Sequence, residues 1–564
     1  MKGAGFRLQE PRRRSIYQKL IPWAGLVVLA TVIMLPVFGR SFPAGFDAVR
    51  HYRWTSQFID ALLDGAAYPR WLPAANEGQG SPVPLYYPPL SFYVAAVFSF
   101  GTGNTLLGMS LSCWLALTLS GLTFYAFSKT LLAPPLSFAA AALYMIAPYH
   151  LLDLYQGSTV SEFWSFAWIP LLLDAVRRVS SGRGFRGIAY LASSYALLVL
   201  THVPVLFLTS LTLVVYALLL TRKLGDLVRI ASGLALGAGM AAIFLIPVLF
   251  ETSYIRLFFK FDYTDYFLFE HVRAALTSNR FPSDGTPYTY LLDTELSGVG
   301  ILILFLISSL VIWSNWRFTK NGRTSSTMSR VVWIVTAFSL LMTTRLSLPI
   351  WRITPGLSFL FFPYRWLVIA SAGTSYLAAS SISLATSGRK WRIILIGALA
   401  IGVVLNLGIS ALAILRAPVA ADDLVAGLSR RDTREYRPIW WHGQLHTEVW
   451  KNAAVVESGN AQVRAIDETG INQSYAVRAD TKSIIEFRPL YFPGWAARVD
   501  GDKIEIAPSA EGHVELSIEP GEHTLTLSFE DTWPRTLGKL VSAVSVLIFL
   551  ALSYASRRRV KHPA

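Results

Sequence analysis

The sequence has 564 residues, of which 53% are hydrophobic and only 15% are charged, whereas soluble globular chains carry about 25% charged residues. This composition argues against an ordinary soluble domain. The 50 Lys and Arg residues outnumber the 35 Asp and Glu residues, but many of them lie in short loops between apolar runs, which indicates membrane orientation and not nucleic-acid binding. The single cysteine, Cys113, excludes an intrachain disulfide and a thiolate metal site.

Apolar runs long enough to cross a bilayer recur along the chain. We predict a first span at residues 20–39, behind a basic cytoplasmic N-terminus at residues 1–19. Arg12, Arg13 and Arg14 resemble the start of a signal peptide, but no small-residue cleavage site follows, so we expect the helix to be retained. The further predicted spans are 105–127, 133–149, 163–176, 187–201, 203–221, 227–249, 296–314, 330–344, 364–385, 392–414 and 536–555, which makes about twelve in all.

The charges between the spans fix their orientation. With the N-terminus inside, every loop expected in the cytoplasm is basic, as the positive-inside rule requires. The apolar stretch 88–100 is too short to cross, and counting it as a span would put the later basic loops outside. We therefore expect it to be an interfacial or re-entrant helix. This topology predicts a multi-pass protein of a bacterial plasma membrane, with both termini cytoplasmic.

Three regions are then predicted on the extracytoplasmic side: loop one (residues 40–104), a central loop (250–295) and a segment of domain size (415–535). In the last, runs of alternating apolar residues at 514–518 and 524–529 are separated by turn signals at 500–501 and 520–521. The fold class expected is therefore mainly α: a transmembrane helical bundle at 20–414, a small antiparallel β-sandwich at 415–535, and a final span with a basic tail at 536–564.

Loop one carries the first candidates for chemistry. Asp47 and His51 are four residues apart, so on a helix they share a face with Arg50 close by. A carboxylate beside an imidazole suits a general base or a metal site, and Arg50, Arg53 and Arg70 could bind a phosphate. The alternative is an amphipathic surface helix with solvated charges. We favour function for Asp47 and the surface helix for His51 and the individual arginines.

Loop two, at about 150–162, adds Asp153 and Glu162. An acid here could face Asp47, although Thr159-Val-Ser-Glu162 also fits a capping box, in which Glu162 would only start a helix. His202 lies at the end of a span, where it either lines a cavity or sits at the interface. Arg365 begins a span on the same side, and it could contact lipid headgroups or bind the phosphate of a lipid-linked donor.

The order of these motifs resembles the GT-C superfamily of membrane glycosyltransferases. An early Asp47 is followed by Tyr68-Pro-Arg-Trp, a glycine-rich step and Tyr87-Pro-Pro-Leu; then come Ala147-Pro-Tyr-His-Leu-Leu-Asp with Glu162, Leu200-Thr-His, Phe362-Pro-Tyr-Arg-Trp and Tyr491-Phe-Pro-Gly-Trp. The sequence is most similar to the YfhO-like glycosyltransferases and to membrane proteins related to 6-pyruvoyl-tetrahydropterin synthase. The histidine cluster of the pterin enzyme is absent from the sequence.

The resemblance implies transfer of a sugar from a polyprenyl-phosphate donor to a glycan, lipid or protein acceptor outside the cell. Asp47 matches the catalytic acidic position of the first loop. Asp153 or Glu162 matches the acidic position of the second loop, and Arg365 matches the arginine at the start of a span. Where relatives often have Arg-Gly, this chain has Gln156-Gly157, which puts phosphate binding by that loop in question. Arginine, or a divalent metal bridged by Asp47, Asp153 and Glu162, would stabilise the leaving phosphate.

Two other functions remain open. A transporter or flippase of lipid-linked substrates predicts ionisable groups inside the spans and broken helices near the midplane. A non-catalytic scaffold predicts that Asp47 and Arg365 are dispensable while the β domain is required.

Overall fold

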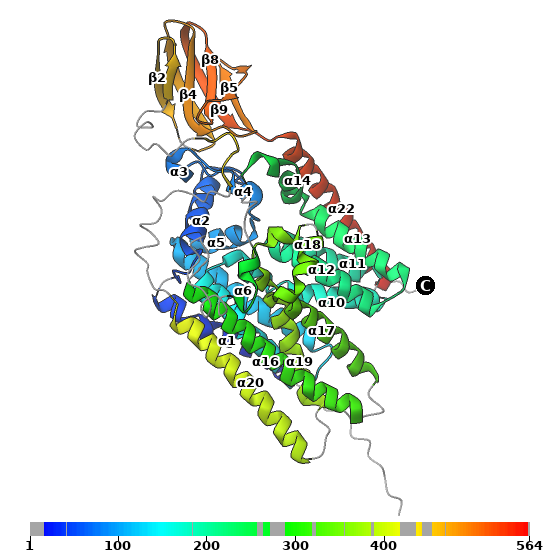
Figure 1. Ribbon diagram of the computed structural model, residues 1–564. Coiled ribbons are helices and arrows are strands. Elements are labelled where there is room, and N and C mark those ends of the chain that lie inside the picture. Colours follow the sequence, from blue (N-terminus) through cyan, green and yellow to red (C-terminus); the bar gives the residue numbers. More distant parts are fainter. Residues whose placement is uncertain are drawn as a thin grey trace, which may run out of the picture.

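The computed structural model describes residues 16–40, 42–182, 184–256, 263–270, 288–318, 323–354, 356–384, 389–417, 436–442, 454–468 and 470–561. A body of helices carries a β domain at one end, and the last helix, α22, returns from the β domain along the helical body (Figure 1). Parts of the predicted central loop (257–262 and 271–287) and of the predicted C-terminal segment (418–435 and 443–453) lie outside the described residues.

The helices occupy most of the chain. Their bounds are α1 Ile16–Arg40, α2 Ala48–Leu63, α3 Ala75–Gly78, α4 Val83–Tyr86, α5 Leu90–Thr102, α6 Thr105–Ser128, α7 Pro134–Met145, α8 Pro148–Leu152, α9 Val160–Ser165, α10 Ile169–Ser180, α11 Gly184–Val199, α12 Val203–Leu220, α13 Leu224–Met240, α14 Ala242–Glu251, α16 Tyr288–Phe318, α17 Arg323–Met342, α18 Leu348–Ile353, α19 Leu367–Leu384, α20 Arg389–Leu415 and α22 Trp533–Lys561. A π-helical turn at Asp153–Gly157 follows α8 directly.

The prediction of about twelve spans is not confirmed. Among the described residues, six helices are long and apolar enough to cross a membrane, or up to eight if each of two bent pairs counts as one span. The chain is a multi-pass membrane protein, but several of its apolar segments are broken or short. Leucines on the outer face of α22, such as Leu540 and Leu547, are more than half exposed, as suits a surface against lipid.

Three predicted spans are interrupted for identifiable reasons. The span at 133–149 bends by 41° after Met145, because Pro148 cannot continue a helix and starts α8. The span at 227–249 bends by 80° at Ala241, whose backbone leaves the helical region. The span at 163–176 is broken between α9 and α10, where Pro170 occupies the first turn of the new helix.

The short apolar segment after loop one forms α5, a helix of 13 residues, which is below the length needed to cross a bilayer. It forms a hairpin with α6. The two backbones approach so closely that a Cβ at Gly108 would lie 2.8 Å from the Ala95 carbonyl oxygen, so only glycine fits there. The expectation that this segment does not span the membrane agrees with that length.

The predicted antiparallel β domain is present as two sheets. Its strands are β1 Ala454–Ser458, β2 Ala461–Asp467, β3 Asn472–Ala479, β4 Ser483–Leu490, β5 Trp495–Val499, β6 Asp502–Ile504, β7 Ala507–Pro508, β8 His513–Ile518 and β9 Gly521–Phe529. One sheet has the order β1-β4-β8-β7 and the other β2-β3-β9-β5-β6, with antiparallel pairing throughout. Alternate residues of the strands meet between the sheets, as in a sandwich.

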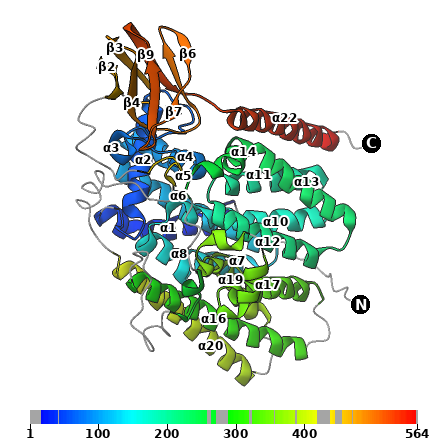
Figure 2. The same cartoon turned by 45° about the horizontal axis from the view of Figure 1, so that its top comes forward.

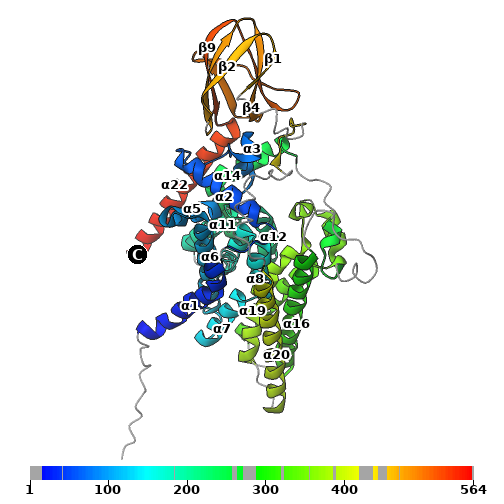
Figure 3. The same ribbon diagram turned by 90° about the vertical axis from the view of Figure 1, so that its left-hand side faces the viewer.

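Loop one reaches up to this domain and shares its core. Trp71 packs against Phe492, Trp495 and Phe529 with ring centroids 5.2 to 5.9 Å away. Gly80, with a φ of +86°, lies so close to Trp71 that a Cβ would overlap the indole. The β domain therefore stands over loop one, as Figure 3 shows from the side.

A buried ion pair joins the β domain to the helices below. Arg535 at the start of α22 bonds Glu251 at the end of α14 at 3.1 Å, and both side chains are almost fully buried. The same guanidinium donates to the carbonyls of Glu530 and Pro493. Because a guanidinium offers several donors in a fixed plane, one residue ties three parts of the chain together.

Candidate functional site

Asp47 stands at the start of α2 and is held there by loop two. The amides of Phe46 and Asp47 donate to the carbonyls of Gln156 and Gly157, each at 2.9 Å. The Asp47 carboxylate accepts from Arg50 at 2.6 Å and keeps 15% of its surface exposed. The two loops predicted to face one another are thus joined through their backbones, and Asp47 remains accessible.

His51 is one turn further along α2 and is buried, with 1% of its surface exposed. The interpretation of His51 as part of a solvated surface helix is therefore wrong. Its Nε2 lies 3.4 Å from the Tyr87 hydroxyl, and burial lowers its pKa to about 4, so the ring is neutral at physiological pH. Its Nδ1 has no hydrogen-bond partner among the described residues.

Glu162 and Arg365 form a buried ion pair. The Arg365 Nε donates to Glu162 at 2.9 Å, and the other carboxylate oxygen accepts from the Tyr149 hydroxyl at 2.8 Å. Thr159 makes no side-chain cap, so the capping-box interpretation of Glu162 is wrong. Arg365 also donates from Nη1 to the Leu360 carbonyl and keeps 12% of its side chain exposed, while Nη2 makes no hydrogen bond to any described residue.

Asp153 and His202 complete the group, and both are buried. One Asp153 oxygen accepts from Thr159, while the other has no partner among the residues that the structure describes. The same holds for His202 Nδ1. A buried polar atom without a hydrogen bond is costly and uncommon in a folded protein, so unpartnered atoms at this spot indicate a place for water or a ligand.

Tyr87 connects the two halves of the site and was not singled out from the sequence. Its ring contacts His51, burial raises the pKa of its hydroxyl, and the charges of Asp47 and Arg365 raise and lower that pKa, respectively. Arg365 and His51 also interact electrostatically with His202. Loop one, loop two, the start of α12 and the start of α19 therefore meet at one polar cluster, which we call the loop cluster: Asp47, His51, Tyr87, Asp153, Glu162, His202 and Arg365.

Gln156 stands where the resembling sequences often have arginine, and its side chain bonds another part of the helical body and not a phosphate site. Its amide donates to Asp293 on α16 at 2.7 Å, and the other Asp293 oxygen accepts from Arg416 at the end of α20 at 2.6 Å. A glutamine fits there because Arg416 already supplies the cation that Asp293 requires.

A divalent metal held by Asp47, Asp153 and Glu162 does not fit this arrangement. No three His, Cys, Asp or Glu side chains in the described part of the chain converge on one point. Both oxygens of Glu162 are occupied by Arg365 and Tyr149, and Asp47 is paired with Arg50. Arginine is thus the cation that the cluster presents.

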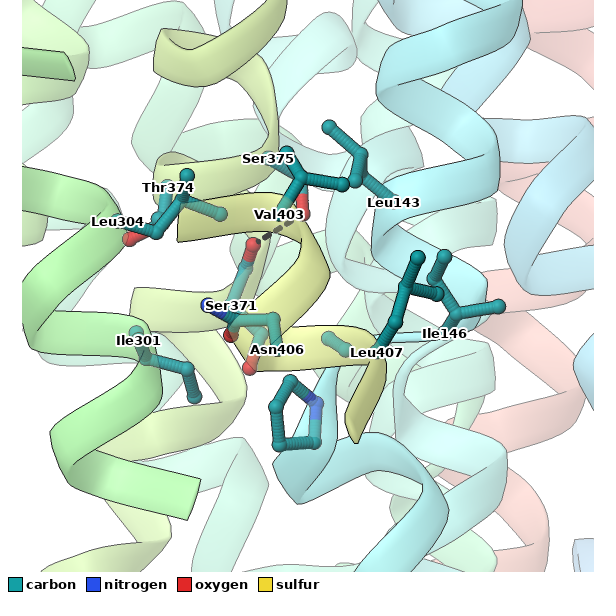
Figure 4. A pocket seen from close by; sticks show the side chains of 12 residues that line it. Leu143, Ile146, Ile301, Leu304, Ser371, Thr374, Ser375, Val403, Asn406 and Leu407 are labelled. Atoms are coloured by element: carbon teal, nitrogen blue, oxygen red, sulfur yellow. Dashed lines mark hydrogen bonds between the residues drawn. The ribbon is translucent and has the colours of Figure 1, made fainter. Parts of the chain in front are cut away.

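Arg70 belongs to a different neighbourhood. Its Nε lies 3.4 Å from Asp531, just before α22, and its guanidinium stacks over the Tyr68 ring at 4.5 Å. The enclosed gap between α7, α16, α19 and α20, drawn in Figure 4, is also separate from the loop cluster; it holds about 10 Å³, room for one water at most. Ser371 and Ser375 on its wall are joined by a hydrogen bond within α19.

Comparison with known proteins gives distant likenesses. An uncharacterized protein of Lactococcus lactis subsp. cremoris is 28% identical over 236 residues, which cover 40% of this chain and 38% of that protein. Among solved structures, ArnT from Cupriavidus metallidurans, bound to undecaprenyl phosphate, has 16% identity and a TM-score of 0.39, with 73% of this chain and 76% of that chain covered.

Two further solved structures are similar at the same level. The Archaeoglobus fulgidus oligosaccharyltransferase has 15% identity and a TM-score of 0.39, covering 76% of this chain and 58% of its own. The mycobacterial arabinofuranosyltransferase AftD has 15% identity and a TM-score of 0.41, covering 71% and 27%.

The family comparison covers more of the sequence. Residues 85–415, more than half of the chain, match the family described as 6-pyruvoyl-tetrahydropterin synthase related domain, membrane protein. The matched region runs from the Tyr87 motif through loop two to α20, and so contains every member of the loop cluster except Asp47 and His51. The chain therefore belongs to the 6-pyruvoyl-tetrahydropterin synthase related family of membrane proteins.

Proposed function

We propose that this protein is a membrane glycosyltransferase that moves a sugar from a polyprenyl-phosphate donor to an acceptor on the extracytoplasmic face. The observation that carries the proposal is the loop cluster. It combines an accessible carboxylate, Asp47, with a guanidinium, Arg365, that is held in place by Glu162. A base and a phosphate-binding cation are the two groups that such a transfer needs.

The reaction follows from these roles. An acceptor hydroxyl attacks the anomeric carbon, and its proton passes to the Asp47 carboxylate. The bond between the anomeric carbon and the phosphate oxygen breaks, and the polyprenyl phosphate leaves with the electron pair. Arg365 is the group that binds the departing phosphate, because its Nη2 makes no hydrogen bond to a described residue. Glu162 is a positioning residue that fixes the guanidinium plane.

The burial of Glu162 and Arg365 supports the roles proposed for them. Glu162 is 2% exposed and Arg365 is 12% exposed, so their attraction acts in a medium of low polarity, where it is stronger than in water. His51 is neutral and therefore does not compete with Arg365 for the phosphate. The neutral ring is suited instead to a hydrogen bond with a sugar hydroxyl, through the Nδ1 atom that has no partner among the described residues.

The test measures transfer of labelled sugar from a polyprenyl-phosphate hexose in membranes that contain the full chain. Asp47→Asn and Asp47→Ala are expected to abolish transfer, and Arg365→Lys to reduce it strongly. Asp64→Asn is the matched control, since Asp64 ends the same helix and is exposed. Transfer that persists in both Asp47 variants, at wild-type protein levels, would overturn the assignment.

A transporter of lipid-linked substrates is the second candidate. It is favoured by the two bent pairs, α7 with α8 and α13 with α14, because broken helices and buried acids such as Asp153 are typical of transport sites. The two functions separate in reconstituted vesicles. A transporter moves the lipid-linked sugar across the bilayer and leaves its sugar-phosphate bond intact, whereas the glycosyltransferase breaks that bond.

A further inference from the structure

A large cavity lies where loop one, the helical body and the β domain meet, and we call it the junction cavity. Its volume is about 650 Å³, within the range of about 300–1,000 Å³ that is typical of small-molecule sites. Residues 66–71 of loop one, the start of α5, Phe529 at the end of β9 and Lys539 on α22 line it. Figure 2 shows α22 leaving the base of the β domain beside α14 and α11.

Two buried polar atoms in the lining make no hydrogen bond to a described residue. Arg70 is 7% exposed, and its Nη2 makes no hydrogen bond to any residue that the structure describes. The Tyr68 hydroxyl is also buried and unpaired within the described chain. A guanidinium nitrogen is only a donor, whereas a phenol can donate and accept. A ligand that satisfies both atoms must therefore present hydrogen-bond acceptors, such as the oxygens of hydroxyl groups.

The charges that line the junction cavity indicate whether an anionic or a neutral ligand fits better. Arg70 and Lys539 contribute two positive charges, and Asp531 contributes a negative charge; the carboxylate of Glu530 is paired with Arg498 at 2.6 Å and Lys503 at 3.7 Å, outside the lining. Asp531 is paired with both cations, at 3.4 Å to Arg70 and in direct contact with Lys539. Because Asp531 already pairs with both cations of the lining, a phosphate or carboxylate in this cavity would have to compete with that carboxylate, which disfavours an anion.

A neutral polyol suits the same surface. Its hydroxyls can donate to Asp531 and accept from Arg70, and its C–H faces can pack on the aromatic and apolar wall formed by Tyr93, Phe529 and Leu90. We propose that the junction cavity is a carbohydrate-binding site that takes a neutral segment of a glycan. If the proposed function is correct, that glycan is the acceptor, and this identification alone rests on the proposed function.

The position of the cavity fits an acceptor. Leu90 and Leu200 line it, and the Leu90 amide donates to the Leu200 carbonyl at 2.9 Å. Tyr87 and His202, members of the loop cluster, lie a few residues away on the same two segments. A glycan bound under the β domain would thus be held by the chain segments that also build the site of transfer.

The test measures glycan binding by the full chain in lipid nanodiscs on a printed array of neutral, phosphorylated and carboxylated oligosaccharides. The wild type is expected to capture neutral glycans. Arg70→Ala removes a charged donor and should weaken capture about tenfold or more, and Tyr68→Phe should weaken it without removing the ring. Ala67→Trp fills the cavity and should abolish capture, whereas Leu63→Trp, at an exposed position outside it, should have no effect.

Three outcomes overturn the proposal: no neutral glycan bound above the level of Ala67→Trp, Arg70-dependent capture of acidic glycans only, or Arg70-dependent co-purification of phosphatidylglycerol without glycan capture. The last two would identify the cavity as an anion or lipid-headgroup site. Asp47→Asn separates this proposal from the proposed function, because it should lose transfer and keep glycan capture. If the wild type captures glycans but transfers no sugar, the proposed function fails and the binding result stands by itself.

Discussion

Replacing Glu162 by alanine should destabilise the protein by about 3–5 kcal/mol, the cost of leaving one member of a buried ion pair without its partner. The structure supports the upper part of this range. Glu162 is 2% exposed and accepts two hydrogen bonds, from Arg365 at 2.9 Å and Tyr149 at 2.8 Å. After the substitution, the Leu360 carbonyl is the remaining hydrogen-bond partner of Arg365 among the described residues. The buried positive charge of Arg365 therefore loses its counter-charge.

The sole cysteine provides the assay. Cys113 is fully buried, so a thiol-reactive fluorophore added to the purified chain in detergent reports when heating opens the helical body. The double variant Glu162→Ala/Arg365→Ala should be less destabilised than the sum of the two single variants, because the second change removes the charge that the first left unpaired. Glu162→Gln, which keeps the side-chain volume and one acceptor oxygen but loses the negative charge, should lie between wild type and Glu162→Ala.

Arg345 supplies the matched control. Its pair with Glu270 is 3.1 Å long, but the arginine side chain is 52% exposed, and exposed pairs contribute only about 0–1 kcal/mol. Arg345→Ala should therefore scarcely change the apparent Tm. Equal shifts for Glu162→Ala and Arg345→Ala, or strictly additive effects in the double variant, would refute the view that Glu162 is placed to hold Arg365.

Three more predictions concern pH, domain docking and one turn. Burial lowers the pKa of His51 from 6.5 to about 4, so between these pH values the unfolded chain binds a proton that the folded chain does not. The stability of the fold should therefore fall as the pH drops from about 6.5 to about 4. His51→Gln should flatten that part of a curve of Tm against pH. Arg535→Ala removes the bond to Glu251 and two carbonyl contacts, and should raise hydrogen exchange in β9 and α14 while exchange in α19 stays unchanged. Gly80→Ala should lower the apparent Tm much more than Gly65→Ala does. Both glycines have φ near +90°, but a Cβ at Gly80 would overlap a tryptophan ring, whereas a Cβ at Gly65 would meet open space. Equal shifts in Tm would contradict the packing argument.

Most residues of the loop cluster could be picked out in the sequence, but only as separate fragments. Asp47, Glu162, His202 and Arg365 could be chosen because charged and imidazole groups at the ends of apolar runs are costly unless they have a role. Local spacing could not decide what each one does. Thr159-Val-Ser-Glu162 satisfies the pattern of a capping box, yet Glu162 bonds a residue 203 positions away and Thr159 bonds Asp153. Tyr87 was part of a recognised motif but received no role, because an aromatic residue in an aromatic loop carries no signal until its neighbours are known.

Composition and periodicity by themselves determined the class of this protein. Long apolar runs can only be satisfied in a membrane, and strands with alternate apolar residues require a second sheet to cover them, so the helical body and the β-sandwich follow from the sequence. Only the tertiary structure decided where the spans break and how the loops meet. Pro148 marks a possible break, but at both bends other helices bond the backbone: Ser410 of α20 donates to the Ile146 carbonyl, and Ser542 of α22 accepts from the Ile243 amide. The loop cluster likewise depends on backbone contacts between Asp47 and Gly157, more than 100 residues apart, which no local pattern encodes.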